Sequence, residues 1–282
     1  MGTSSSNPGQ RPSTPLLPNW SDLPPLVDPQ LPTQPIGNNQ IFNVNQRPAV
    51  SPVADENRFR QPRSNFTRYL SSRGRSRASL GSAIGRCISS GYGGAKTASR
   101  RMTASRYATS NLIEILGEIK RDGLSETLKR LSKENLKGKP PKEIFASLVD
   151  IICPADGSID VGIARDAFIE TIILQSDDID QNLNFTDDQI NIIVIQFISK
   201  TISLRLFNDI GNKYDFSNLD ANSAIQIQES VDGFIFDSIR NQLLTELNGI
   251  GKGISRKELE PLITKVYENA FKILQIEAEG IK

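Results

Sequence analysis

The chain has 282 residues and a net charge of only +1, because 33 Lys and Arg side chains nearly balance 32 Asp and Glu side chains. It contains no histidine, which removes the commonest general base and excludes catalytic pairs of the Ser-His and Cys-His kinds. Its two cysteines, Cys87 and Cys153, are too few for a disulfide framework and lack metal-ligand spacing, which indicates a reducing compartment. We therefore expect a protein that is not an enzyme and has neither a cofactor nor a metal site.

A cytoplasmic location without a membrane partner is also expected. The N-terminus lacks the basic and apolar regions of a signal peptide, and no apolar run reaches the length of a membrane span.

Charge is distributed unevenly along the chain. Residues 1–57 carry two basic and four acidic side chains, whereas residues 58–106 carry twelve basic side chains and no acidic one. Residues 107–282 carry nineteen basic and twenty-eight acidic side chains. A basic middle between two acidic parts indicates either an anionic partner or docking within the chain.

Residues 1–65 predict a long disordered or extended arm, because they contain twelve of the sixteen prolines and many Asn, Gln and Ser residues. The first twenty residues join a polar tip to an apolar anchor that includes Trp20, the only tryptophan. One interpretation is an ordinary disordered terminus, since disorder concentrates at chain ends. The other is a tail that another protein holds.

The tip has a distinctive chemistry because Gly2 follows Met1, and such a small residue normally allows removal of the initiator methionine. The exposed α-amino group would have a pKa of roughly 7.7–8.0, against about 10.4 for lysine. Gly2 would then be the most readily deprotonated nitrogen nucleophile of the chain. Since glycine has no Cβ, this tip could also enter a narrow channel.

Residues 66–107 predict a basic helical segment rich in Arg, Ser and Gly. Apolar residues at helical spacing predict a short helix over residues 80–88 and a second helix over residues 95–120, separated by a turn or hinge at Gly91–Gly94. Seven arginines lie on and around these elements: Arg73, Arg75, Arg77, Arg86, Arg100, Arg101 and Arg106. They indicate a surface for nucleic acid or phosphate. The alternatives are a solvated basic face, or one that pairs with the acidic helices of the chain.

Residues 108–282 predict an all-α helical bundle. Apolar periodicity predicts helices over residues 124–131, 141–153, 161–174, 187–211 and 223–247, and a last helix that begins near Ser255. Capping-box patterns occur at Thr186 with Gln189 and at Ser255 with Glu258. We expect the helices over 187–211 and 223–247 to lie at the centre of the bundle. The loops 155–160 and 249–253 lack the ligand spacing of a calcium loop and of a phosphate loop respectively.

Several fragments together resemble the B component of the Qat anti-phage defence system. They are MGTSSS, PLLPNW, RYLSSRGR, LGSAIGRCISSGYGGAKTASRRMTASR, the Cys-Pro pair at Cys153, TDDQ and RLFNDIG. The similarity runs from the first residue to the last helix, and Phe66–Arg106 carries most of it.

The resemblance implies a four-part bacterial system that also contains an ATPase, a QueC-like enzyme related to the nitrile-forming synthase of 7-deazaguanine biosynthesis, and a TatD-like nuclease. In a related defence system, a queuosine-type enzyme joins a deazaguanine base to the N-terminal glycine of a partner protein. If the same reaction occurs in this system, the resemblance implies that the α-amino group of Gly2 is the acceptor. The tail that binds the partner enzyme would comprise Gly2, Thr3, Ser4, Leu16, Leu17, Pro18 and Trp20. Residues 7–14 are poorer in glycine than the family pattern, so their contacts do not carry over.

The expected function is therefore that of a non-enzymatic defence component whose N-terminal tail is bound and modified by the QueC-like enzyme of the same operon. The ATPase and the nuclease are further partners that the resemblance suggests. The alternative is a nucleic-acid-binding adaptor that uses the Arg-rich region 73–106.

Overall fold

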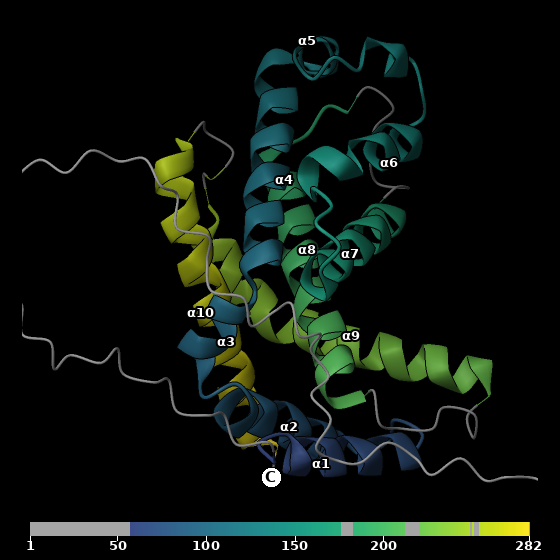
Figure 1. Cartoon of the computed structure of the whole chain (residues 1–282), viewed down its shortest axis with the longest axis vertical. Helices are drawn as coiled ribbons and strands as arrows, with labels where there is room; N and C mark the ends of the chain where they lie inside the picture. The colour runs from purple at the N-terminus through teal and green to yellow at the C-terminus, as the bar shows by residue number, and fades with distance from the viewer. Residues whose placement is uncertain (1–56, 176–182, 212–219, 249, 251–253, 282) are drawn as a thin grey trace, which may run out of the picture. The chain divides into compact units, whose positions relative to one another are not determined.

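The computed structural model describes residues 57–175, 183–211, 220–248, 250 and 254–281 (Figure 1). Every regular element in these ranges is helical and none is a strand, which confirms the all-α prediction. The expectations for the arm up to residue 56, including those for Gly2 to Trp20, lie outside the described residues.

Ten α-helices make up the described part of the chain. They are α1 (Arg60–Ser71), α2 (Arg77–Arg86), α3 (Ala95–Arg101), α4 (Thr103–Asp122), α5 (Leu124–Arg130), α6 (Pro141–Ile152), α7 (Ile159–Gln175), α8 (Asp187–Leu206), α9 (Ala221–Glu246) and α10 (Arg256–Gly280). Short π-helical turns follow α2 at Cys87–Gly91 and α8 at Phe207–Gly211, and a 3-10 turn lies at Glu134–Leu136.

Helix α1 corrects the boundary expected at residue 65. It begins at Arg60, so residues 60–65 are helical rather than extended. Pro62 is its third residue, where the missing backbone N–H has no partner within the helix to lose. Phe66 and Leu70 are buried on one face, and α1 packs against α2 through it. The burial of this apolar face stabilises the helix by more than Pro62 destabilises it, so residues 60–65 fold as part of the helical body.

The helix predicted over residues 95–120 is two helices in the structure. Met102 separates α3 from α4, with a backbone φ of −95° and ψ of 36°. Its side chain is only 3% exposed, and both α3 and α4 pack against α10. The apolar pattern is continuous across Met102 because the residues on both sides of the break contribute to the same core.

Helix α8 is the central helix of the bundle, as predicted. Its buried side chains lie on all sides, and it packs against α4, α7 and α9 (Figure 1). The prediction was wrong for α9, which buries a single stripe of five residues along its 26-residue length. Helix α4, with eleven buried residues, takes the second central place.

The segment Asp187–Gly211 is long and apolar enough to cross a membrane, contrary to expectation, but 72% of its apolar window is buried within the bundle.

Both predicted capping boxes form. Gln189 donates its backbone N–H to the Thr186 hydroxyl over 3.2 Å, and the side chain of Gln189 accepts the Thr186 N–H over 3.0 Å. At the start of α10, the Glu258 carboxylate accepts the Ser255 backbone N–H over 3.2 Å. Each box satisfies backbone donors that have no partner within the helix, so α8 and α10 begin where the sequence predicts.

A buried lysine connects three helices. Lys200 of α8 is 7% exposed, and its Nζ donates to Glu170 of α7 over 2.7 Å and to Asp232 of α9 over 2.6 Å. Burial favours the neutral amine, but the hydrogen bonds to Asp232 and Glu170 outweigh it and raise the pKa of Lys200. The Ser203 hydroxyl also donates to Asp232. This cluster fixes the spacing of α7 and α9 around α8.

Candidate functional site

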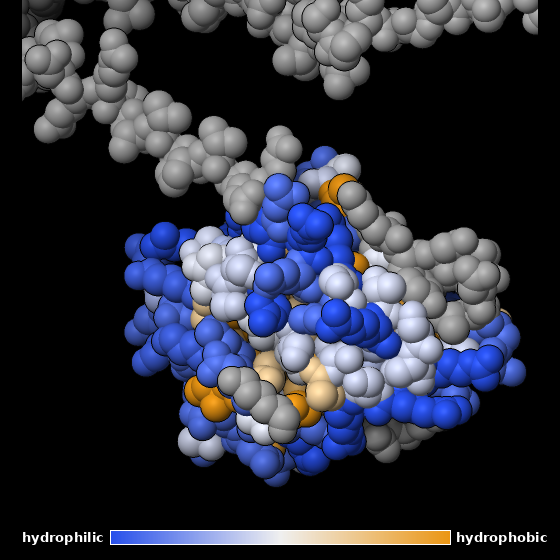
Figure 2. Space-filling view, turned by 90° about the horizontal axis from the view of Figure 1, so that it is seen from below, coloured by the Kyte–Doolittle hydropathy of each residue, from blue (hydrophilic) through white to orange (hydrophobic). Residues whose placement is uncertain are grey.

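The seven predicted arginines divide into an exposed and an inward-facing group. Five are exposed and lie on α2, on α3 or in the loop before α2, namely Arg73, Arg75, Arg77, Arg86 and Arg100. Seen from the side of α1 and α2, the surface is mostly hydrophilic (Figure 2). Within the described ranges, no Lys or Arg between residues 58 and 106 forms an ion pair. Direct pairing with the described acidic helices therefore does not neutralise this surface.

Arg101 and Arg106 differ from the other five because they are partly buried beside α10 and α7. Arg106 donates Nη1 to the Thr264 hydroxyl and Nη2 to the Thr103 hydroxyl, the latter over 3.4 Å. Its Nε is buried and has no hydrogen-bond partner among the described residues. Burial lowers the pKa of Arg106, although the guanidinium remains charged at any physiological pH. The Nε of Arg101 is likewise buried without a partner in the part of the chain that the structure describes.

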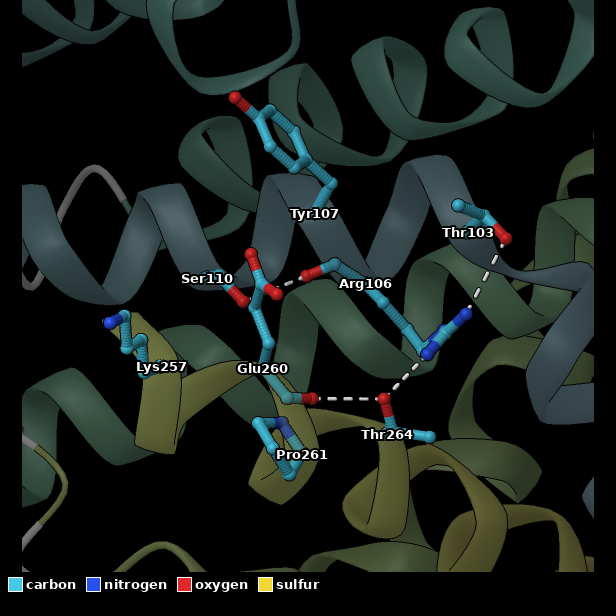
Figure 3. A pocket seen from close by; sticks show the side chains of 8 residues that line it. All are labelled: Thr103, Arg106, Tyr107, Ser110, Lys257, Glu260, Pro261 and Thr264. Atoms are coloured by element: carbon cyan, nitrogen blue, oxygen red, sulfur yellow. Dashed lines mark hydrogen bonds between the residues drawn. The ribbon is translucent and has the colours of Figure 1, made fainter. Parts of the chain in front are cut away.

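Arg106 lies in a groove of about 520 Å³ between the N-terminal halves of α4 and α10, which we call the Arg106 groove (Figure 3). Its lining residues are Thr103, Arg106, Tyr107, Ser110, Lys257, Glu260, Pro261 and Thr264. Figure 3 shows Arg106 reaching from α4 to Thr264, while Glu260 points from α10 towards α4. The lining side chains carry two positive charges and one negative charge, so the groove is weakly cationic.

A second groove, of about 470 Å³, lies between α4 and the segment that joins α6 to α7. We call it the Asp156 groove. It shares Thr103 and Tyr107 with the Arg106 groove, and it is otherwise lined by Ala104, Cys153, Pro154, Ala155, Asp156, Ser158, Asp160, Val161 and Ala164. The hydroxyl and the backbone N–H of Ser158 lower the pKa of Asp156, so this carboxylate is ionised at neutral pH.

Tyr107 is the ridge between the two grooves. Its side chain is 46% exposed, and the Arg256 guanidinium lies over its ring at 4.8 Å from the centroid. Arg256 is itself held by Glu114 of α4 over 3.0 Å. An exposed aromatic ring that is fixed in this way presents a large contact surface at little further cost in conformational entropy.

Neither cysteine has the environment of a nucleophile. Cys87 is fully buried and Cys153 is 2% exposed, and burial raises the pKa of each thiol to about 12. Both thiols are therefore protonated at neutral pH, whereas the thiolate is the reactive form. Among the described residues, no group of three or more His, Cys, Asp or Glu side chains could hold a metal ion.

A family model named "Qat anti-phage system associated protein QatB" matches residues 93–274, well over half of the chain. The chain belongs to the QatB family. It is thus a component of an anti-phage defence system and acts with other Qat proteins, which confirms the resemblance found in the sequence. No curated protein and no solved structure matches the chain.

Both grooves lie inside the region that the QatB model matches, whereas α1, α2 and the arm precede it. Of the residues that line the Arg106 groove, only Arg106 was predicted as a site residue from the sequence; Tyr107, Lys257, Glu260 and Pro261 are among those that were missed. Two features of the sequence could have pointed to the groove. Tyr107 is an aromatic residue outside the apolar stripe of its helix, and Pro261 is a proline within the sequence of α10.

Proposed function

We propose that this QatB-family protein is the non-enzymatic component of its defence complex, and that its N-terminal tail is the substrate of a QueC-like partner. The partner would bind residues 2–20 and attach a 7-deazaguanine-type base to the α-amino group of Gly2. The N-terminal sequence carries this proposal: a glycine amine after Met1, followed by the apolar anchor Leu16–Trp20, in a member of a multi-protein defence family.

The chemistry of the body supports a passive role in this reaction. The chain contains no histidine, and burial holds both thiols in the protonated form. Lys200, the most buried amine described, is held as an ammonium by Glu170 and Asp232 and is not a free nucleophile. The α-amino group at Gly2 has the lowest reference pKa of any amine in the chain, so it is the best candidate for an acceptor.

Mass spectrometry of the intact protein and of its N-terminal peptide tests the proposal. The protein would be purified after expression with its operon partners, and again without the QueC-like enzyme. We expect an added mass on the Gly2 amine only when that enzyme is present. An unmodified glycine terminus in both samples would refute the proposal.

A pair of alanine variants separates modification from general effects on the tail. Gly2→Ala still allows methionine removal but places a Cβ beside the acceptor amine, so we expect loss of the added mass and of phage protection. Gly9→Ala, in the same tail, should retain both. Equal behaviour of the two variants would contradict a specific role for Gly2.

The exposed arginines support a second candidate function, binding of nucleic acid through Arg73, Arg75, Arg77, Arg86 and Arg100. These five cations lack ion pairs within the described part of the chain and therefore remain available to phosphates. Each phosphate contact contributes a slope of about −0.9 to log K against log salt concentration.

The double variant Arg75→Glu, Arg77→Glu should flatten that slope by about 1.8 if both side chains contact phosphates. Lys129→Glu with Lys137→Glu, at two exposed positions elsewhere, is the control. Equal slopes for the two double variants, measured by fluorescence anisotropy on a labelled duplex, would reject this function.

A further inference from the structure

We infer that the Arg106 groove and the Asp156 groove form one docking site for an extended segment of another protein of the same defence system. The segment would place an acidic group at the α10 end and a basic group at the α7 end. This inference concerns the helical body and goes beyond the proposed function, which concerns the N-terminal tail.

The two grooves adjoin each other at Thr103 and Tyr107. Thr103 and Tyr107 line both of them, so a chain lying in one groove can cross Tyr107 into the other. Tyr107 is 46% exposed and its ring is stacked under Arg256. Rigid, partly exposed tyrosines of this kind are typical anchors of protein interfaces. The aromatic ring therefore lies in the middle of the site, where binding energy concentrates.

At the α10 end, the groove has a surplus of positive charge. Arg106 is partly exposed in the groove, and its positive charge suits a carboxylate there. Lys257 adds a second cation at the rim. The negative charge of Glu260 is partly balanced by Arg256, whose Nε lies 3.5 Å from its carboxylate. An acidic side chain is thus the complementary occupant here.

At the α7 end, the charge has the opposite sign. Asp160 is paired with Arg205, but Asp156 is exposed, ionised and without an ion pair in the described ranges. A basic side chain complements it. This reversal of charge along the site argues against a nucleic-acid strand, because its phosphates would meet Asp156 after leaving Arg106. A protein segment can carry both signs, so it is the occupant that fits.

Photo-crosslinking tests which molecule occupies the site. The full chain would carry p-benzoylphenylalanine in place of Tyr107 and would be expressed with its operon partners. The control carries the same group in place of Ile276, which is 68% exposed on α10 and lines neither groove. We expect the probe at position 107, and not that at 276, to link to one segment of one Qat protein. Identical products from both positions, no protein adduct, or an adduct with nucleic acid would overturn the inference.

Once the partner is identified, charge-reversal variants test which end of its segment lies in which groove. Lys257→Glu and Asp156→Lys should each weaken the complex about tenfold or more in biolayer interferometry, as expected at a charged, complementary interface. The matched controls Lys265→Glu and Asp166→Lys change exposed residues outside the grooves and should stay within about twofold. Equal losses in test and control variants would refute the site.

The Gly2 adduct, measured on the same samples, keeps the two proposals distinct. If the adduct is absent while the crosslink at position 107 forms, only the tail proposal fails.

Discussion

Replacing Lys200 by Met should destabilise the bundle strongly. The substitution keeps an unbranched side chain of similar length but removes the cation that Glu170 and Asp232 share. Removing one partner of a buried ion pair costs about 3–5 kcal/mol, because a carboxylate is left desolvated without compensation. The Asp232 side chain is 12% exposed and that of Glu170 is 34% exposed, so Glu170 can regain water. We therefore expect about 3 kcal/mol, the lower end of that range, which is a large part of a typical domain's stability.

Urea denaturation followed by far-ultraviolet circular dichroism measures this loss. Tryptophan fluorescence is unsuitable because Trp20, the only tryptophan, is not a residue of any of the described helices. The control is Lys272→Met, which removes an exposed ion pair with Glu268 and should cost at most about 0.5 kcal/mol.

The double variant Lys200→Met, Asp232→Asn should regain stability relative to Lys200→Met, because it removes the stranded charge while Asn can still accept from Ser203. If Lys200→Met costs no more than Lys272→Met, the cluster does not connect α7, α8 and α9 as argued.

Two further predictions concern the core. Since burial raises both thiol pKa values to about 12 from an ordinary 9.0, the unfolded chain loses these protons first, and stability falls as the pH rises from 9 towards 12. Each thiol should cost about 1.4 kcal/mol at pH 10, and Cys153→Ala should flatten the fall in urea titrations. Gly91→Ala should destabilise the fold, because its Cβ would lie 2.7 Å from the Phe59 ring. Gly233 lies in the middle of α9, and a Cβ added there would meet no atom within 4 Å. Gly233→Ala should therefore stabilise the fold by about 0.5–1 kcal/mol and raise its thermal midpoint. A higher thermal midpoint for Gly91→Ala than for Gly233→Ala would contradict the packing described around these two glycines.

Most helices of the body could be predicted because their signals are local. Thr186 with Gln189 and Ser255 with Glu258 mark helix starts through contacts three residues apart, and Pro141 occupies the first turn of α6, as predicted. The break at Met102 could not be predicted, since it depends on how α3 and α4 each meet α10. The start of α1 was missed because a proline-rich composition extends past Arg60, although Phe66 and Leu70 already mark an apolar face.

The candidate site was harder to predict than the fold. Arg106 looks like one of seven surface arginines in the sequence, but its hydrogen bond to Thr264 spans 158 positions. No local pattern shows that Tyr107, Lys257 and Pro261 line one groove, because their proximity follows from the packing of α4 against α10. The family resemblance identified the defence system, whereas the grooves required the tertiary structure.

Helix α1 is also the mechanical attachment of the arm. A partner that pulls on the arm would load α1 before it loads any other helix, because the chain enters the body there. The load would fall on the packing of α1 against α2, on Phe66 and Tyr69, and on Arg63, whose guanidinium holds the carbonyl of Asp209 at 3.0–3.1 Å beyond the end of α8. Traction on the arm would thus reach the end of the central helix through Arg63 and through the contact of Phe66 with Phe207. It would also reach α10 through α2, which packs against both α1 and α10.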